Sequence, residues 1–125
     1  MNALKDLITL EKDARDYGFD WSDYEMILEQ VIDECREIKE AINDGESKER
    51  VQEEIGDLLH TAISLCRFLE FDVEETLNKT GVKFAKRMEA VKTLTRKHNL
   101  PNLQGQSAEF LLKLWREAKE INKKE

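Results

Sequence analysis

The spacing of apolar residues constrains this chain most strongly, because it follows a helical period in nearly every segment. The chain has one proline and five glycines among 125 residues, so helices can run long. Hydrophobic residues make up 40% of the chain and charged residues 38%, a balance typical of amphipathic helices. The pattern predicts a single all-α domain over residues 1–125, since the chain is too short for two ordinary domains.

Five helices are predicted, at about residues 3–16, 23–42, 48–70, 73–97 and from 107 onward. Ser22 is the predicted N-cap of the second helix, because Glu25 stands three residues later in the capping-box position. The turn at residues 43–47 is so short that the second and third helices must form an antiparallel pair.

Acidic residues lie on or beside the apolar seams of this predicted pair. The seam of the second helix has a 4-3-4-3 spacing in which Glu34 takes a position suited to leucine, and Glu37 lies one turn further on the same side. In the third helix, Glu54 and Asp57 border the predicted seam. The seams comprise Ile27, Val31, Glu34, Ile38 and Ala41 in the second helix, and Val51, Ile55, Leu58, Ala62, Leu65 and Leu69 in the third.

Antiparallel packing would bring together the carboxylates of Glu34, Glu37, Glu54 and Asp57, named the acidic quartet below. Two unit charges about 6 Å apart at an effective dielectric near 20 repel by roughly 3 kcal/mol. Several such pairs rival the whole stability of a small domain, roughly 5–15 kcal/mol. Either some carboxyls are protonated or a cation lies among them. Oxygen ligands favour Mg²⁺ or Mn²⁺. Each motif alone is more often a solvated helix face, but two on adjacent helices favour the metal site.

Other kinds of site and partner fit the sequence less well. A di-iron bundle needs two Glu-x-x-His motifs, and the spacing occurs here once, at Asp57 and His60. The net charge of −7 argues against a nucleic-acid-binding surface. Cys35 and Cys66 are too few for a disulfide framework and are expected to be reduced thiols. With no signal peptide or membrane-spanning run visible, we expect no membrane contact and a cytoplasmic location.

Several short strings resemble those of the MazG-type nucleoside triphosphate pyrophosphohydrolases, in the all-α NTP pyrophosphatase group. The acidic strings are DECRE at 33–37 and EEIGD at 53–57. The others are GFDW at 18–21, the K-F-x-x-R pattern at 83–87 and LWREAK at 114–119. The sequence departs from the family pattern at Gln30, Asp33 and Gly81, where lysine, glutamate and asparagine are common.

The resemblance implies Mg²⁺-dependent hydrolysis of a nucleoside triphosphate to a monophosphate and pyrophosphate. Glu34, Glu37, Glu54 and Asp57 would be the metal ligands, with Glu37 and Glu54 as candidate catalytic residues. Lys83 and Arg87 would contact phosphates. Trp115 would stack on the base or, in the favoured interpretation, pack in the core. Weaker candidates for substrate contact are Asp33, Arg50 and Lys119.

The resemblance also implies a homodimer, in which helices of two subunits complete a four-helix bundle; a tetramer is the other arrangement considered. One alternative is a non-catalytic helical protein that senses nucleotides or binds partners through a residual metal site. Asp33, Gln30 and Gly81 leave room for it. A weaker alternative is a coiled-coil adaptor without metal.

Overall fold

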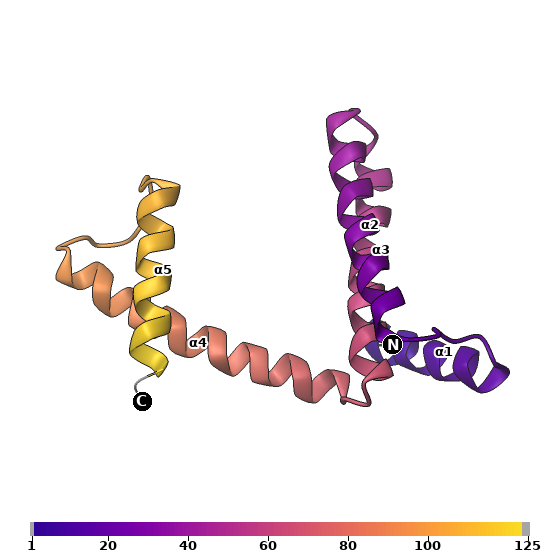
Figure 1. Cartoon of the computed structure of the whole chain (residues 1–125). Helices are drawn as coiled ribbons and strands as arrows, with labels where there is room; N and C mark the ends of the chain where they lie inside the picture. Colours follow the sequence, from indigo (N-terminus) through magenta and orange to yellow (C-terminus); the bar gives the residue numbers. More distant parts are fainter. Residues whose placement is uncertain (1, 124–125) are drawn as a thin grey trace. The chain divides into compact units, whose positions relative to one another are not determined.

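Every regular element in residues 2–123, the part described by the computed structural model, is an α-helix (Figure 1). This confirms the predicted all-α class. None of these described helices is long and apolar enough to cross a membrane. Backbone contacts divide the chain into two compact units that meet between Val73 and Glu74. The helices are α1 (Ala3–Tyr17), α2 (Tyr24–Asn43), α3 (Lys48–Phe68), α4 (Val73–Lys97) and α5 (Ala108–Lys123).

Short polar side chains begin the helices of the first unit. The N-cap of α2 is Asp23, not the predicted Ser22: the Asp23 carboxylate accepts the Met26 N–H at 2.8 Å. Aspartate is as good an N-cap as serine, and Asp23 stands three residues before Met26. The predicted cap at Ser22 is therefore wrong by one residue. Ser47 caps α3, accepting the Arg50 N–H at 3.2 Å.

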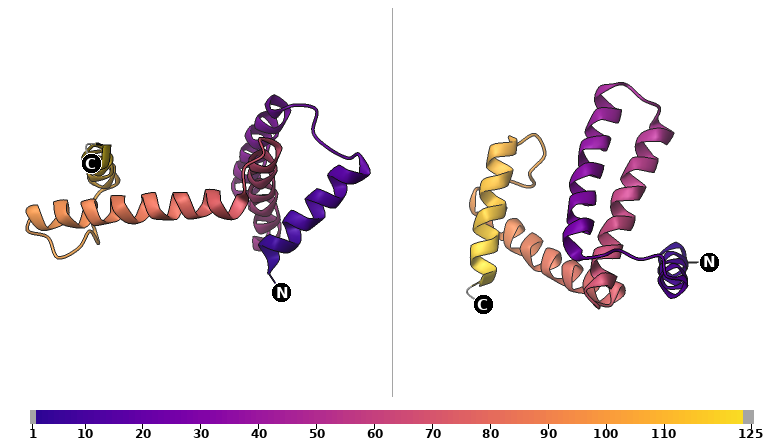
Figure 2. Two further views of the ribbon diagram at one scale, coloured as in Figure 1. Left: turned by 90° about the horizontal axis from the view of Figure 1, so that it is seen from below. Right: turned by 45° about the vertical axis from the view of Figure 1, so that its right-hand side comes forward.

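The antiparallel pair of α2 and α3 forms the body of the first unit, as the short turn predicted (Figures 1 and 2). Helix α1 lies across the C-terminal half of α3. The Ser64 hydroxyl of α3 donates to Glu11 Oε1 of α1 at 2.7 Å, and the Arg15 guanidinium donates to the Arg67 carbonyl at 3.2 Å. Two polar contacts therefore attach α1 to the helix that carries half of the acidic quartet.

The predicted seam is confirmed for α2 and partly wrong for α3. Ile27, Glu34 and Ala41 of α2 are buried. On α3 the buried residues are Glu54, Thr61 and Ser64, while Val51, Leu58 and Leu65 are half-buried. Three members of the predicted seam are exposed: Ile55, Ala62 and Leu69. Helix α3 carries two neighbouring apolar stripes, and its rotation presents the one that includes Glu54. Glu54 therefore lies inside the interface instead of bordering it.

The second unit packs α4 against α5 around small residues. Ala90 and Val91 of α4 meet Ala118 of α5, and Trp115 covers this cluster from the side. Leu114 is fully buried. The chain returns through residues 98–107, and the Ser107 hydroxyl accepts the Phe110 N–H at 3.2 Å to begin α5. This packing places the Arg87 guanidinium of α4 beside the ring of Trp115.

Candidate metal and phosphate site

Glu34 is a buried carboxylate held by a hydrogen bond across the helix pair. Its residue surface is 3% exposed, and its Oε1 accepts a hydrogen bond from the Thr61 hydroxyl of α3. The same hydroxyl lies 3.0 Å from the Asp57 carbonyl oxygen, one turn earlier in α3. Burial of a carboxylate costs free energy unless it is hydrogen-bonded, so Thr61 makes this position tolerable. The hydroxyl also fixes the direction in which Glu34 points.

Thr61 is the functional neighbour that the sequence prediction missed. It stands four residues after Asp57 and therefore on the same side of α3. That spacing was available in the sequence. However, threonine on an amphipathic helix carries little information until the register against α2 is known.

Glu54 is the second buried carboxylate of the pair, at 8% exposure, and it lies beside a basic group. The Arg50 guanidinium approaches Glu54 Oε1 at 3.1 Å. Arg50 also contacts Glu53 at 3.1 Å and Glu46 at 3.5 Å. Its hydrogen bond with Glu53 is the largest cause of its raised pKa, followed by the charge of Glu54. Arg50 thus balances part of the negative charge of α3, and its guanidinium already contacts three carboxylates.

The pKa of Glu54 is raised above its ordinary value, chiefly because burial penalises the charged carboxylate. The charge of Arg50 opposes this shift. The charge of Glu37, a hydrogen bond with Glu37 and the charge of Asp57 add to it. The interior of the pair therefore favours retention of a proton near Glu54.

The quartet members lie near one another across α2 and α3, but their carboxyls do not form a closed ligand set. Among residues 2–123, no three acidic, histidine or cysteine side chains are close enough together to hold a metal ion. Glu34 accepts a hydrogen bond from Thr61, and Glu54 forms an ion pair with Arg50. Glu37 and Asp57 are exposed. The donors are all carboxylate oxygens, the chemistry that a hard divalent cation takes. To bind such an ion, Glu54 would have to exchange its Arg50 contact for it, and the exposed carboxylates of Glu37 and Asp57 would have to turn toward it.

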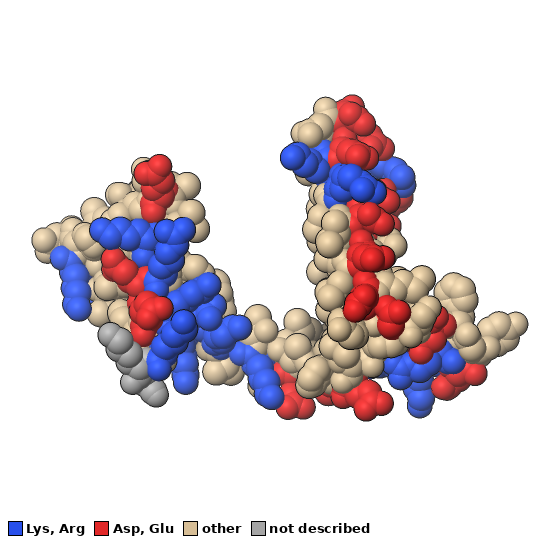
Figure 3. Space-filling view, viewed as in Figure 1, with Lys and Arg blue, Asp and Glu red and all other residues tan. Residues whose placement is uncertain are grey.

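The remaining candidate of the first unit, Asp33, pairs with Arg36 one turn away at 3.2 Å and is half-exposed. Acidic side chains follow the α2–α3 pair in Figure 3. In the second unit, lysines and arginines gather over α4 and α5. Each unit therefore carries charge of predominantly one sign on the face shown.

The basic candidates Lys83, Arg87 and Lys119 all belong to the second unit. Lys83 and Lys119 are exposed and Arg87 is half-buried. Lys79, one turn before Lys83 on α4, pairs with Glu75 at 3.4 Å. Lys83 and Arg87 lie one turn apart on α4, a spacing at which two cations can contact one polyphosphate.

Trp115 packs within the second unit, as the favoured interpretation predicted. Its ring lies 5.8 Å from the Phe84 ring, and the Arg87 guanidinium lies over it at 5.5 Å from the centroid. It also contacts the Ala90, Val91 and Ala118 cluster. These contacts orient Arg87 by a cation–π interaction. They also occupy much of the surface on which a base would stack.

Comparison with known proteins identifies the matching region. Residues 22–92 match the MazG nucleotide pyrophosphohydrolase domain, a segment that contains the whole acidic quartet. The nucleoside triphosphate pyrophosphohydrolase/pyrophosphatase MazG of Thermotoga maritima is 36% identical over 110 residues, covering 88% of this chain and 41% of that protein. The nucleoside triphosphate pyrophosphohydrolase of Escherichia coli K12 is 28% identical over 111 residues, covering 88% and 42%. The chain thus spans about two fifths of the length of these relatives.

Proposed function

Since the chain belongs to the MazG nucleotide pyrophosphohydrolase family, we propose that it hydrolyses nucleoside triphosphates to nucleoside monophosphates and pyrophosphate. The supporting observation is the burial of two carboxylates, Glu34 and Glu54, between α2 and α3, within the segment that matches the family. Two buried carboxylates weaken an apolar interface. Their presence there therefore indicates a role that requires negative charge. Binding of a cation and its phosphate substrate is such a role.

Glu34, Glu37, Glu54 and Asp57 are the proposed ligands of Mg²⁺, with Mn²⁺ as the other candidate. When bound, such an ion neutralises phosphate charge and lowers the pKa of a water molecule. Thr61 keeps Glu34 oriented for this task through its hydroxyl. Arg50 contacts Glu54 in the metal-free chain, and it would still have Glu53 and Glu46 as partners if an ion took its place at Glu54.

The proposed reaction forms one bond and breaks another at the α-phosphorus. The oxygen of a water molecule bonds to the α-phosphorus, and the bond to the oxygen shared with the β-phosphate breaks, so that pyrophosphate leaves. A carboxylate of the Glu37 and Glu54 pair takes the proton from the water. Both carboxylates remain candidates for this role, and burial raises the pKa of Glu54 in the metal-free chain. Lys83 and Arg87 are the proposed contacts for the departing phosphates.

The proposed assembly is a homodimer, with a tetramer as the larger alternative. Helices α2 and α3 expose apolar side chains on their outer faces, among them Ile32 at 66% and Leu59 at 63% exposure. A second antiparallel pair would cover these rows and complete a four-helix bundle. The proposed location is the cytoplasm, where the thiols of Cys35 and Cys66 would stay reduced.

The test is incubation of the whole chain with the common ribo- and deoxyribonucleoside triphosphates and Mg²⁺, with separate assays of pyrophosphate and monophosphate. We expect equal amounts of both products and complete loss of activity in EDTA. Glu54→Gln should abolish turnover at unchanged helicity, whereas Glu29→Gln, at an exposed position of α2, should not change it.

Three outcomes would contradict the proposal: no pyrophosphate from any nucleotide, release of orthophosphate instead, or activity that survives EDTA. Binding of nucleotide by calorimetry without any hydrolysis would assign the chain to the alternative, a nucleotide-sensing protein with a residual metal site.

A further inference from the structure

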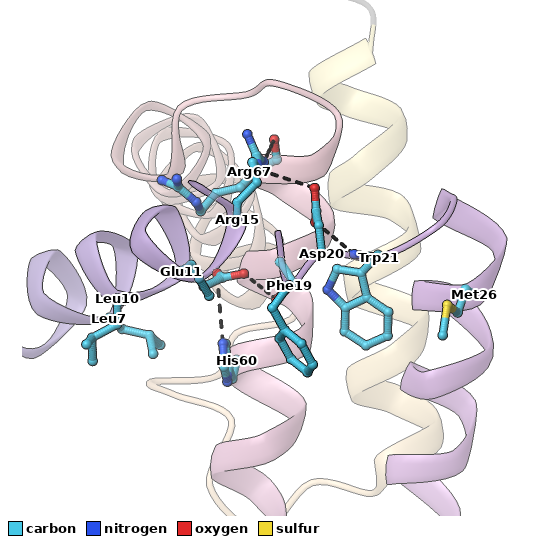
Figure 4. A pocket seen from close by; sticks show the side chains of 12 residues that line it. Leu7, Leu10, Glu11, Arg15, Phe19, Asp20, Trp21, Met26, His60 and Arg67 are labelled. Atoms are coloured by element: carbon cyan, nitrogen blue, oxygen red, sulfur yellow. Dashed lines mark hydrogen bonds and ion pairs between the residues drawn. The ribbon is translucent and has the colours of Figure 1, made fainter. Parts of the chain in front are cut away.

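A cavity of about 470 Å³ lies between α1, the segment after it and α3 (Figure 4). Its volume is in the range of small-molecule pockets. Apolar walls come from α1, including Leu7, and aromatic rings come from Phe19 and Trp21. His60 and Ser64 of α3 complete the side opposite α1. The acidic quartet does not contribute to this lining, so the cavity is a separate feature of the first unit.

The cavity contains a carboxylate oxygen that lacks a hydrogen-bond donor. Glu11 Oε1 accepts from the buried Ser64 hydroxyl at 2.7 Å. Glu11 Oε2 is buried and has no hydrogen-bond partner among residues 2–123. The nearest cationic candidate, His60 Nε2, lies 3.9 Å away, beyond hydrogen-bond distance. This acceptor is unused, and a donor that enters between Glu11 and the aromatic rings would reach it once the Glu11 carboxylate turns toward the cavity.

Three other charged residues line the cavity: Arg15, Asp20 and Arg67. Arg15 pairs with Asp20 at 3.5 Å and donates to the Arg67 carbonyl at 3.2 Å. These contacts hold the segment that carries Phe19 and Trp21 against α1 and α3. The cavity thus combines flat apolar walls with one acceptor-only group. This combination suits a planar ring that carries an N–H donor at its edge.

The position along α3 relates the cavity to the acidic quartet. His60 and Ser64 stand three and seven residues after Asp57, or about 4.5 and 10.5 Å along the helix axis. All three residues face the same side of α3, because spacings of three, four and seven return to one helix face. In a nucleotide, one ribose separates the base from the α-phosphate. This length is compatible with the separation between Asp57 and the cavity residues along α3.

We propose that this cavity binds the nucleobase of the substrate and that Glu11 selects bases that present an amino group. The inference rests on the proposed function, since it concerns the base of the same nucleotide. Cytosine, adenine and guanine each carry an exocyclic amino donor, whereas uracil and thymine place carbonyl oxygens beside their N–H. A carboxylate attracts the amino group and repels those carbonyls. Trp21 and Phe19 supply the faces on which the ring stacks.

CTP and UTP provide the sharpest test, because their bases differ chiefly by an amino group in place of a carbonyl oxygen. We expect kcat/KM to favour CTP by about tenfold or more, the scale of one unpaired buried polar group. Glu11→Gln keeps an acceptor for Ser64 and adds a donor for the uracil carbonyl, so it should reduce the ratio to about threefold or less. Asp13→Asn, at an exposed position of α1, is the matched control.

A binding assay separates failure of this inference from failure of the proposed function. In a Trp115→Phe background, Trp21 is the only tryptophan, so its fluorescence reports on the cavity. We expect CMP to quench it with an affinity about tenfold above that of UMP, and Glu11→Gln to remove the difference. This result requires no hydrolysis and would stand even if no triphosphate were cleaved.

An unchanged CTP-to-UTP ratio in a folded Glu11→Gln variant would overturn the inference while leaving the hydrolase intact. Equal CMP and UMP affinities, or fluorescence that neither nucleotide changes, would also overturn it. A change of oligomeric state on Leu10→Lys, with the base ratio preserved, would assign the cavity to contact with a second copy of the chain instead.

Discussion

Glu34 and Glu54 occupy interface positions where an antiparallel helix pair ordinarily buries apolar side chains. Thr61 offsets the burial of one and Arg50 the burial of the other. The two solutions differ in consequence. A neutral hydroxyl leaves the charge of Glu34 in place, whereas Arg50 neutralises a charge that a metal ion could neutralise as well. Glu54 is therefore the residue at which metal binding and protonation compete.

Glu54→Gln should raise the melting temperature of the metal-free protein at pH 7. A raised pKa means that the protonated carboxyl is the form the fold favours. Its contribution to stability is complete below the ordinary pKa of unfolded glutamate and is lost as pH rises through the raised value. In EDTA, the melting temperature of Glu54→Gln should therefore exceed that of the wild type by an amount that grows from pH 4 to pH 8.

The same substitution should remove the stabilisation by Mg²⁺. An ion that binds only the folded state adds about 2.7 kcal/mol at 100 times its Kd. Wild-type protein and Glu29→Gln should show this rise, and its size should increase with pH because Glu54 must lose its proton. A Glu54→Gln variant that is less stable than the wild type in EDTA, or equally stabilised by Mg²⁺, would contradict the proposed ligand role.

At the scale of helices, α3 shows how rotation decides which residues reach the interface. Its two apolar stripes have similar hydrophobicity, so periodicity alone could not select between them. The observed rotation buries Glu54, Thr61 and Ser64 and leaves Ile55 and Leu59 exposed. That single choice places Glu54 toward α2, Ser64 toward α1 and an apolar row toward solvent.

Two glycines have opposite effects on helix stability: Gly18 ends α1, and Gly81 lies in the interior of α4. Gly18 ends α1 with φ of +103°, a conformation that L side chains rarely adopt. Gly18→Ala should cost about 1–2 kcal/mol of unfolding free energy. Gly81 lies inside α4, and a Cβ there would meet no atom of the described residues within 4 Å. Gly81→Ala should stabilise by about 0.5–1 kcal/mol.

Urea unfolding of both variants provides the measurement, with helicity followed by circular dichroism. A stabilising Gly18→Ala would show that the α1 terminus rearranges. A destabilising Gly81→Ala would show that α4 is covered at this position in the assembled protein.

At the scale of the whole molecule, the exposed apolar rows of α2 and α3 should form the subunit contact. Leu59→Lys places a charge in the middle of the α3 row and should convert the dimer to a monomer in sedimentation experiments. Glu49→Lys, on the polar side of the same helix, should leave the mass unchanged. A Leu59→Lys protein that sediments like the wild type would move the proposed contact to another surface.

Helical period and turn length are local properties of the chain, so the sequence alone predicted the helices and the antiparallel pair. Residue spacing likewise marked four acidic positions as candidates for a metal site. The tertiary structure decided which stripe of α3 faces α2, since that depends on contacts summed over the whole interface. It also decided that Thr61 supports Glu34, that Arg50 is held by carboxylates, and that Glu11 meets Ser64 beside Trp21. Glu11 and Ser64 are separated by 53 positions in the chain, so no local sequence pattern could reveal their contact.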